Sequence, residues 1–353
     1  MPMRDVVLGW DVGGAHLKAV LVDDDGAASH ALELPCPLWQ GIDHLDRAIE
    51  DTLARITASP AAHAVTMTGE LADCFTDRVL GIAAIVDALS ARVPADRLHV
   101  FAGRRGFLPV SGMAAATAEI ASANWLASAM YLATVIGEAL LVDIGSTTTD
   151  LVPVAGGNVL VIGDHDFTRL AADELVYTGI TRTPLMSVAE RAPFEGRQVG
   201  LMAEHFATTA DVHRLTGELA EYADLYPSAD RGPKTVEGSA RRLARMVGRD
   251  AASAPIDAWR ELARFFADRQ LERLVVAAGR VAARGGLSAQ APIVGAGVGI
   301  FLARRLAARL DRSYLDFATL VRRAGAAAED LVACAPAFAV AHLLGTSRQG
   351  ARR

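Results

Sequence analysis

Residues 9–18 of this chain read GWDVGGAHLK, and residues 141–150 read LVDIGSTTTD. In both stretches an apolar run ends at an aspartate, Asp11 or Asp143, glycine follows, and a second apolar run begins. Each stretch predicts a β-hairpin: a strand that ends at a carboxylate, a turn that only glycine can make, and a returning strand over 17–22 or 150–154.

The turns of both hairpins are suited to holding phosphate. Glycines allow backbone N–H groups to approach an anion closely, and hydroxyl groups supply further donors. Asp11 and Asp143 offer the carboxylate oxygens that bind Mg²⁺, directly or through water. Two such hairpins facing each other would form a phosphate clamp, whose expected members are Gly13, Gly14, Lys18, Gly145, Ser146, Thr147, Thr148 and Thr149.

Composition limits the function classes. A chain of 353 residues is long enough for two domains with a sizeable core. The net charge of -6 predicts no nucleic-acid partner and no anionic membrane partner. Three scattered cysteines favour neither a disulfide framework nor a zinc site. The residues before Asp11 are too few for a signal peptide, and no apolar stretch is long enough for a bilayer, so a cytoplasmic location is expected. The oligomeric state stays open, with a homodimer as one option.

Lysine occurs only at Lys18 and Lys234, whereas arginine is abundant. A GC-rich genome explains the bias, but a lysine retained in the first hairpin stands out against it. Lys18 is either a ligand-facing catalytic residue or a surface lysine at the end of a strand.

The rest of the chain alternates strands with helices. The pattern predicts strands over 6–10, 17–22, 31–35, 64–68 and 98–101, and helices over 43–58, 74–92 and 114–132, before the second hairpin restarts the pattern. This repetition favours a duplicated α/β topology. We expect one domain over 1–135, with a C-terminal helix over 335–353 packing back on it, and a second over 136–334. The polar stretch of about 163–257 is expected to be an insertion carrying substrate contacts, or a lid.

A third glycine motif, PIVGAGVGIFL, covers residues 292–302 and predicts a strand, a glycine turn and a helix. It lacks the GxGxxG spacing of a dinucleotide site and has no room for the following βαβ unit. Gly295 and Gly297 are expected to lie under a planar ring or a phosphate. The alternative is close packing of strand against helix.

In order and spacing, these three motifs resemble those of the acetate and sugar kinase, Hsp70 and actin superfamily. That resemblance covers nearly the whole chain and implies two RNase H-like domains around a central cleft. It does not fix the reaction.

A narrower resemblance is carried by Gly13-Gly14-Ala15 and by the stretches TMTGELADCF, ELVYTG and FATTADV, at 66–75, 174–179 and 206–212. They are similar to the hydantoinase/oxoprolinase-related family linked to tetrahydromethanopterin C1 transfer. The resemblance implies methanofuran-type cofactor biosynthesis: an aminomethylfuran-methyl group moves from its diphosphate to the phenol oxygen of a glutamyl-tyramine or glutamyl-tyrosine acceptor, and pyrophosphate leaves. Mg²⁺ is the implied cofactor, and ATP binding is left open.

Two other functions are weighed on the same fold. One is an ATP-dependent small-molecule kinase or a hydantoinase-like amide hydrolase. Many relatives carry a threonine after the paired glycines, whereas this chain has Ala15, which offers no hydroxyl group. This difference argues against ordinary binding of the ATP γ-phosphate. The other is a nucleotide-binding scaffold, which the missing partner-binding domain argues against.

The remaining candidate residues each have a plainer alternative. Glu70 is expected to accept the phenolic proton, or else to cap a helix. A polar loop is expected either to bind the aminomethyl or glutamyl part of a substrate or simply to close a turn; its residues are Tyr177, Thr178 and Arg182. Two further acids lie seven positions apart, so on a helix they would share a face and grip an ammonium group, or form a solvated face. These acids are Glu204 and Asp211.

Overall fold

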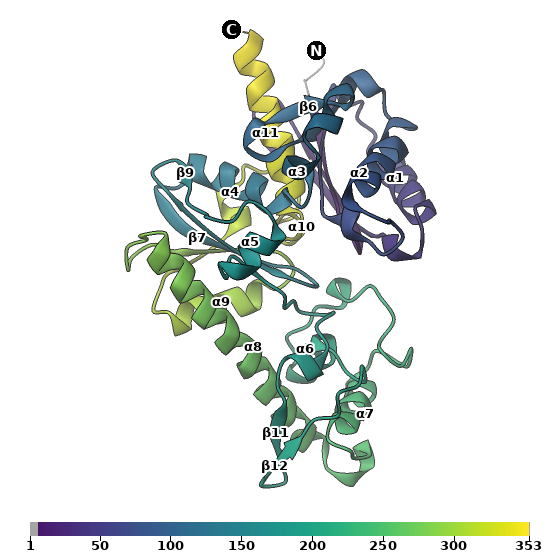
Figure 1. The fold of residues 1–353 in the computed structure, drawn as a ribbon, viewed down its shortest axis with the longest axis vertical. Coiled ribbons are helices and arrows are strands. Elements are labelled where there is room, and N and C mark those ends of the chain that lie inside the picture. The colour runs from purple at the N-terminus through teal and green to yellow at the C-terminus, as the bar shows by residue number, and fades with distance from the viewer. Residues whose placement is uncertain (1–5, 353) are drawn as a thin grey trace.

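The computed structural model describes residues 6–352, and Figure 1 shows two sheet-containing bodies with a third lobe beside them. Residues 1–5 of the predicted first domain and Arg353 of the predicted last helix lie outside the described residues. In the described part of the chain, no helix combines the length and apolar character needed to cross a membrane.

The first sheet has the strand order β3-β2-β1-β4-β5-β6. Neighbouring strands are antiparallel within β3-β2-β1, and β1, β4 and β5 are parallel. Helices α1 (Asp43–Arg55) and α2 (Arg78–Ser90) contribute apolar residues to the core on one face. The strands are β1 (Val7–Val12), β2 (His16–Val22), β3 (Ala28–Pro35), β4 (Ala62–Met67), β5 (Leu98–Phe101) and β6 (Phe107–Pro109).

The second sheet repeats this arrangement as β10-β8-β7-β13-β14, with β9 paired to β8. With β9 left aside, the first three strands in chain order are β7, β8 and β10, and neighbouring strands among them are antiparallel. Strands β7, β13 and β14 are parallel. Both sheets therefore have the order third-second-first-fourth-fifth, which confirms two RNase H-like domains. The strands are β7 (Glu138–Ile144), β8 (Thr149–Ala155), β9 (Asn158–Val159), β10 (Leu175–Val176), β13 (Ile293–Ala296) and β14 (Tyr314–Asp316).

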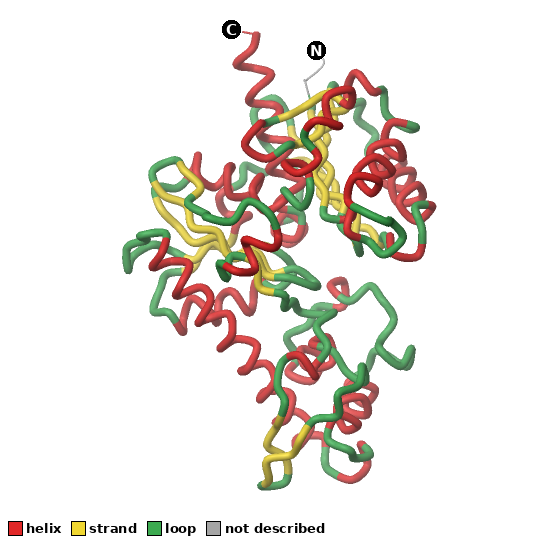
Figure 2. Tube along the Cα trace, viewed as in Figure 1, coloured by secondary structure: helices red, strands yellow, loops and turns green. Residues whose placement is uncertain are grey.

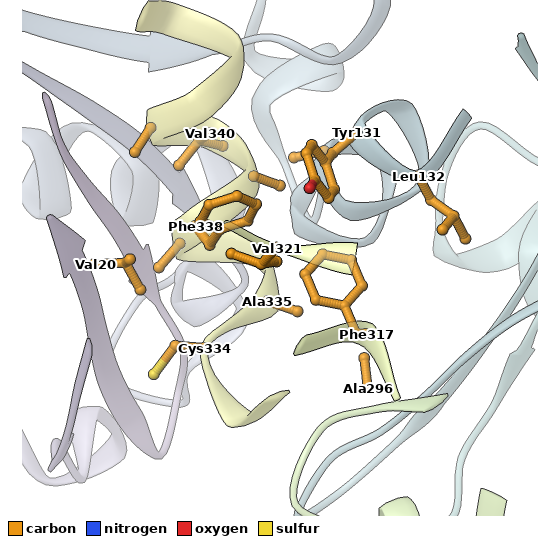
Figure 3. Packing of buried hydrophobic residues seen from close by; sticks show 14 of the residues in the cluster. Val20, Tyr131, Leu132, Ala296, Phe317, Val321, Cys334, Ala335, Phe338 and Val340 are labelled. Carbon is orange, nitrogen blue, oxygen red and sulfur yellow. The ribbon is translucent and has the colours of Figure 1, made fainter. Parts of the chain in front are cut away.

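Two helices lie between the sheets, α4 (Asn124–Val135) and α11 (Ala335–Arg352). They share one apolar core with residues of both sheets (Figure 3). Within it the Tyr131 ring lies 5.6 Å from the Phe317 ring and 4.9 Å from the Phe338 ring. Helix α11 packs on β1, β2 and β4, so the last helix lies against the first sheet.

The third lobe follows β10 and has its own apolar core, to which α6, α7, β11 and the first half of α8 contribute. The second half of α8 belongs to the core of the second sheet, so one helix of 29 residues, about 43 Å long, connects the two bodies (Figure 2). The elements are β11 (Arg191–Phe194), β12 (Arg197–Gly200), α6 (Thr209–Thr216), α7 (Val236–Met246) and α8 (Ile256–Arg284).

Three sequence predictions need correction. Part of the predicted insertion of 163–257 belongs to the second sheet, because β10 pairs with β8. Helix α2 begins at Arg78, since the Asp77 carboxylate caps it by accepting from the Leu80 amide at 2.9 Å. The predicted helix over 114–132 is broken, because Ser122 has a φ of 50° that no α-helix contains. The other helices are α3 (Thr117–Ile120), α5 (Asp166–Ala171), α9 (Ile300–Arg309) and α10 (Ala328–Ala333).

Candidate active site

A cavity of about 430 Å³ lies where the two hairpins face each other. The first hairpin presents Asp11, Gly14 and Lys18 to it, and the second presents Asp143 and the loop over 145–148. The rest of the wall comes from Trp39, the segment over 68–73 that follows β4, residues before and at the start of α4, residues of α5, the chain leading into the third lobe, and Pro336 of α11. The predicted residues that line it are Asp11, Gly13, Gly14, Lys18, Asp143, Gly145, Ser146, Thr147, Thr148, Tyr177 and Arg182.

Of the two predicted reasons for the hairpin glycines, the structure contradicts one, the special turn conformation, and agrees with the other, close approach of a ligand. Gly13, Gly14 and Gly145 have no left-handed backbone conformation, so φ does not require glycine there, although a Cβ on Gly13 would lie only 3.0 Å from the His16 carbonyl oxygen. A Cβ placed on Gly14 would have no heavy atom within 4 Å, and one on Gly145 would make only an ordinary contact with the Thr148 carbonyl oxygen at 3.6 Å. Glycine at these positions leaves the backbone open to the cavity, as close approach of a ligand requires.

Strand pairing sets the charges of the first hairpin. Asp11 and Lys18 lie opposite each other in the β1–β2 register. Burial raises the pKa of Asp11 to about 6, while Lys18 and the Asn124 amide, 3.4 Å away, oppose the rise. Burial lowers the pKa of Lys18, but Glu33, 3.7 Å away, and Asp11 outweigh it, so the net shift is upward. Lys18 is therefore a fixed positive charge at the cavity.

The second hairpin places two carboxyl groups together. Asp143 and Asp150 are partners in the β7–β8 register. Burial raises the pKa of Asp143 to about 7, with Asp150 and Asp11 adding to the rise and Lys18 opposing it. Asp150 is held by Arg169 at 2.9 Å, and that guanidinium lies 3.9 Å from the centre of the Trp125 ring. Arg169 thus neutralises the charge of Asp150, whereas Asp143 faces the cavity without an arginine partner among residues 6–352.

Close packing positions the loop of the second hairpin. A Cβ on Gly179 would lie 2.4 Å from the Ser146 carbonyl carbon and the Thr147 amide nitrogen, so only glycine allows this approach. The amides of Ile180 and Arg182 then donate to the carbonyls of Gly145 and Ser146 at 3.1 and 2.9 Å. The chain entering the third lobe therefore holds the predicted phosphate loop in place.

Aromatic side chains surround part of the cavity. The Arg182 guanidinium lies 4.8 Å from the centre of the Trp39 ring, and Tyr177 is exposed at the wall. Tyr226, from the third lobe, lies 5.0 Å from the Trp39 ring and 5.3 Å from the His16 ring. Trp39, Tyr177 and Arg182 therefore give the cavity wall planar groups on which an aromatic ligand can pack, and Tyr226 packs against the Trp39 ring without itself lining the cavity.

Several predicted site residues do not reach the cavity. Thr149 is buried and donates to the Thr178 carbonyl at 2.8 Å, and the Thr178 hydroxyl accepts from Gln270 at 2.9 Å. Gly295 packs on the Tyr314 side chain, whose hydroxyl would lie 2.3 Å from a Cβ there. Gly297 is needed behind Asp143 because its φ is +79° and a Cβ would meet that carboxylate at 2.4 Å. Close packing therefore accounts for both glycines, but it is packing on residues of the strands β14 and β7 and not the predicted packing of strand against helix.

The predicted pair of acids does not form. Glu204 is exposed in a loop before α6, so it shares no helix face with Asp211. Asp211 is buried, caps α6 by accepting from the Thr208 amide, and pairs with the buried Arg242 at 2.7 Å. Asp211 stabilises the third lobe and offers nothing to an ammonium group.

Glu70 lies behind the wall. Its side chain is 1% exposed, and its Oε1 accepts from the Ser122 hydroxyl at 2.8 Å. Ser122 lines the cavity, and its hydroxyl also lies 3.4 Å from Asp166, which Arg78 holds at 2.7 Å. Neither predicted role fits directly: Glu70 does not touch the cavity, and it caps no α-helix.

The prediction from the sequence missed several lining residues. Asp150 lies at the start of the returning strand of the second hairpin, and its position directly after the hydroxyl cluster of 146–149 was a signal in the sequence. His16, which follows the glycines of the first hairpin, also lines the cavity. Thr68 belongs to the stretch over 66–75 that carries the family resemblance. Further lining residues come from segments without a motif, and only the fold brings them here; they include Trp39, Ser122, Asn124, Trp125, Asp166 and Arg169.

Gly14→Ala should separate ligand approach from folding. Because a Cβ here meets no protein atom, we expect the midpoint of thermal unfolding to stay within about 2 °C. The methyl group would enter the space at the cavity wall and should weaken pyrophosphate binding, measured by calorimetry, by about tenfold or more. Gly137→Ala is the matched control, since a Cβ there is equally free but lies outside the cavity wall. Equal pyrophosphate affinity in all three proteins would contradict the clamp.

The repeated strand order and the facing hairpins place the chain in the class of two-domain RNase H-like proteins that includes actin and the sugar kinases. The chain belongs to the hydantoinase/oxoprolinase family, whose profile, described as Hydantoinase/oxoprolinase, matches residues 61–346.

Named relatives come from methanogens. The chain is 29% identical over 343 residues to the (4-{4-[2-(gamma-L-glutamylamino)ethyl]phenoxymethyl}furan-2-yl)methanamine synthase of Methanocaldococcus jannaschii, covering 97% of this chain and 98% of that protein. It is 31% identical over 111 residues to the protein of the same name from Methanococcus vannielii, covering 31% of this chain and 50% of that protein. Among solved structures, component A of the Acidaminococcus fermentans (R)-2-hydroxyglutaryl-CoA dehydratase has 12% identity and a TM-score of 0.47, covering 98% of this chain and 99% of that one.

Proposed function

We propose that this chain is an enzyme of methanofuran-type cofactor biosynthesis. It transfers an aminomethylfuran-methyl group from its diphosphate to the phenol oxygen of a glutamyl-tyramine or glutamyl-tyrosine acceptor and releases pyrophosphate. The reaction is an alkyl transfer: a carbon–oxygen bond to the diphosphate breaks, and an ether bond to the phenol forms.

The observation that carries this proposal is a cavity whose wall combines phosphate-binding groups with aromatic rings. Hairpin backbone, hydroxyl groups and Lys18 line it together with Trp39, Tyr177 and Arg182, and the Arg182 guanidinium contacts both the Trp39 ring and, at 3.5 Å, the Thr147 hydroxyl. The name of the relative from Methanocaldococcus jannaschii describes a product with a phenoxymethyl group on a furan, which is the ether that such a cavity would form. The alignment to that relative spans almost the full length of both chains.

The residues at the cavity fit Mg²⁺. Asp11 and Asp143 are carboxyl groups whose pKa values are raised by burial, so a divalent cation between the hairpins would offset the unfavourable desolvation of their charges. Among the described residues, three acids come close enough together to share one ion only on the turn of Asp23, Asp24 and Asp25, away from the cavity wall. A cation in the cavity would therefore have Asp11 and Asp143, water and substrate oxygens as its ligands. When bound, Mg²⁺ would neutralise charge on the diphosphate and its leaving group.

The chain's own groups supply the rest of the chemistry. A furylmethyl diphosphate ionises readily because the ring oxygen delocalises the developing cation. The Lys18 ammonium, the backbone N–H groups of the hairpin turns and the hydroxyls of Ser146 and Thr147 would stabilise the departing pyrophosphate. The rings of Trp39 and Tyr177 would orient the acceptor and exclude water from the reactive carbon.

The test is mass spectrometry of a reaction that contains Mg²⁺, aminomethylfuran-methyl diphosphate and either glutamyl-tyramine or glutamyl-tyrosine. We expect an ether product and one pyrophosphate per ether, with no requirement for ATP. Comparing the two acceptors identifies the one that is used. The absence of ether with both acceptors, together with ADP formed from ATP and the furan alcohol or monophosphate, would instead support a kinase.

A further inference from the structure

Glu70 is a buried carboxyl group that the proposed reaction does not yet use. Its Oε1 has one hydrogen bond, from Ser122, and its Oε2 is buried without a hydrogen-bond partner among the described residues. A carboxylate kept only for stability normally has its oxygens satisfied, because an unpaired buried acceptor costs about 1–3 kcal/mol. Burial raises the pKa of Glu70, and the hydrogen bond from Ser122 opposes the rise. Glu70 is therefore a stronger base than an exposed glutamate.

Ser122 is the residue between Glu70 and the cavity. It has a φ of 50°, a conformation that is strained for serine and that persists where the surrounding structure enforces it, often at functional sites. This conformation breaks the helical run before α4. The Ser122 hydroxyl lines the cavity and at the same time donates a hydrogen bond to Glu70. A serine hydroxyl in this position retains lone pairs for a donor in the cavity.

Charged groups beside this pair favour one direction of proton movement. Asp166 lies 3.4 Å from the Ser122 hydroxyl, but Arg78 holds the same Asp166 oxygen at 2.7 Å. That oxygen is thus engaged by a permanent positive charge, whereas Arg78 acts on Glu70 only through a longer-range attraction that lowers its pKa, and Glu70 has a second oxygen without a hydrogen-bond partner among the described residues. Of the two carboxylates, Glu70 is better placed to take up a proton.

Resting on the proposed function, we infer that Ser122 relays the phenolic proton of the acceptor to Glu70. The phenol O–H donates to the Ser122 oxygen. As the phenol oxygen forms its bond to the furylmethyl carbon, its proton passes to Ser122 and the Ser122 proton passes to Glu70. The bond from that carbon to the diphosphate breaks, and pyrophosphate leaves with the electron pair. Ser122 is then a catalytic residue, and Glu70 is the base that acts through it.

Two variants test the relay, Ser122→Gly and Glu70→Gln. Glycine relieves the strain at a φ of 50° while removing the hydroxyl, so this variant is expected to fold. With glutamyl-tyramine we expect kcat to fall about 100-fold or more in both variants. With a ring-fluorinated glutamyl-tyramine, whose more acidic phenol is already ionised at the assay pH, we expect the loss to shrink to less than about fivefold, because no base is then needed.

The control is Ser128→Ala, which removes another buried hydroxyl of the same region, one outside the cavity wall. It should leave kcat unchanged with both acceptors. An equal loss with both acceptors in Ser122→Gly and Glu70→Gln would assign them a structural role and overturn the relay. So would an acceptor-dependent loss in Asp166→Asn but not in Glu70→Gln. Failure of the proposed function is distinct, because wild type and Ser128→Ala would then form no ether either.

Discussion

Asp143→Asn is expected to lower ether formation by about a thousandfold while making the metal-free protein more stable at pH 8. The activity falls because asparagine removes a carboxylate from the site proposed for Mg²⁺ and the leaving pyrophosphate. Stability rises because the folded protein holds this carboxyl group at a pKa of about 7, against 3.8 in its ordinary state.

The sign of this change in stability follows from proton binding. Between these two pKa values the folded state binds more protons than the unfolded state, so the wild type loses free energy of unfolding as pH rises toward and through 7. The asparagine side chain of the variant does not ionise and escapes this loss. We expect the variant to be about 2 kcal/mol more stable at pH 8, roughly half of what the pKa difference alone would give, because Asp143 is partly solvated.

Urea unfolding at pH 8 and pH 5 without divalent cations measures the effect, which should be much smaller at pH 5. Asp24→Asn is the matched control, because it removes an exposed carboxylate outside the cavity wall. Mg²⁺ should raise the thermal midpoint of the wild type more than that of Asp143→Asn. A variant that is less stable than the wild type at pH 8 would show that this carboxylate is structural.

The two hairpins could be predicted from sequence because everything that defines them is local. Apolar alternation gives the strands, and the aspartate marks the end of each first strand. The duplicated topology of the two domains could also be predicted, because the same local pattern of strands and helices occurs twice in the sequence. The sequence could not decide between the two predicted reasons for the hairpin glycines, because it does not distinguish a glycine that is needed for its φ, such as Gly297, from one that leaves open space, such as Gly14.

The rest of the wall depends on contacts between distant segments. Ser122 lies in an alanine-rich run that has helical character throughout, and only its packing against Glu70 and Asp166 reveals a break. Asp211 shows the reverse case: its spacing from Glu204 was compatible with a ligand site, but a partner 31 residues away, Arg242, neutralises it. Charge partners set by tertiary structure decide whether an acid is functional.

Gly9→Ala is expected to destabilise the protein by about 3 kcal/mol or more. A Cβ at this position in β1 would lie 1.9 Å from the Ala337 carbonyl oxygen and 2.9 Å from the Ala341 Cβ, both on α11. The nearest atom belongs to helix backbone, so the helix must move, and overpacking of a buried contact is destabilising. The movement would disturb the core that α11 shares with both sheets (Figure 3).

Gly345→Ala on the same helix is the control for this prediction. A Cβ there would contact the Val7 side chain at an ordinary 3.8 Å, and alanine favours the helix over glycine, so stability should rise by up to about 1 kcal/mol. Urea unfolding followed by circular dichroism measures both variants. Gly9→Ala should also reduce turnover, because Pro336 at the start of α11 lines the cavity and would shift with the helix. A Gly9→Ala protein within about 1 kcal/mol of the wild type would mean that α11 yields easily and does not fix the spacing of the two hairpins.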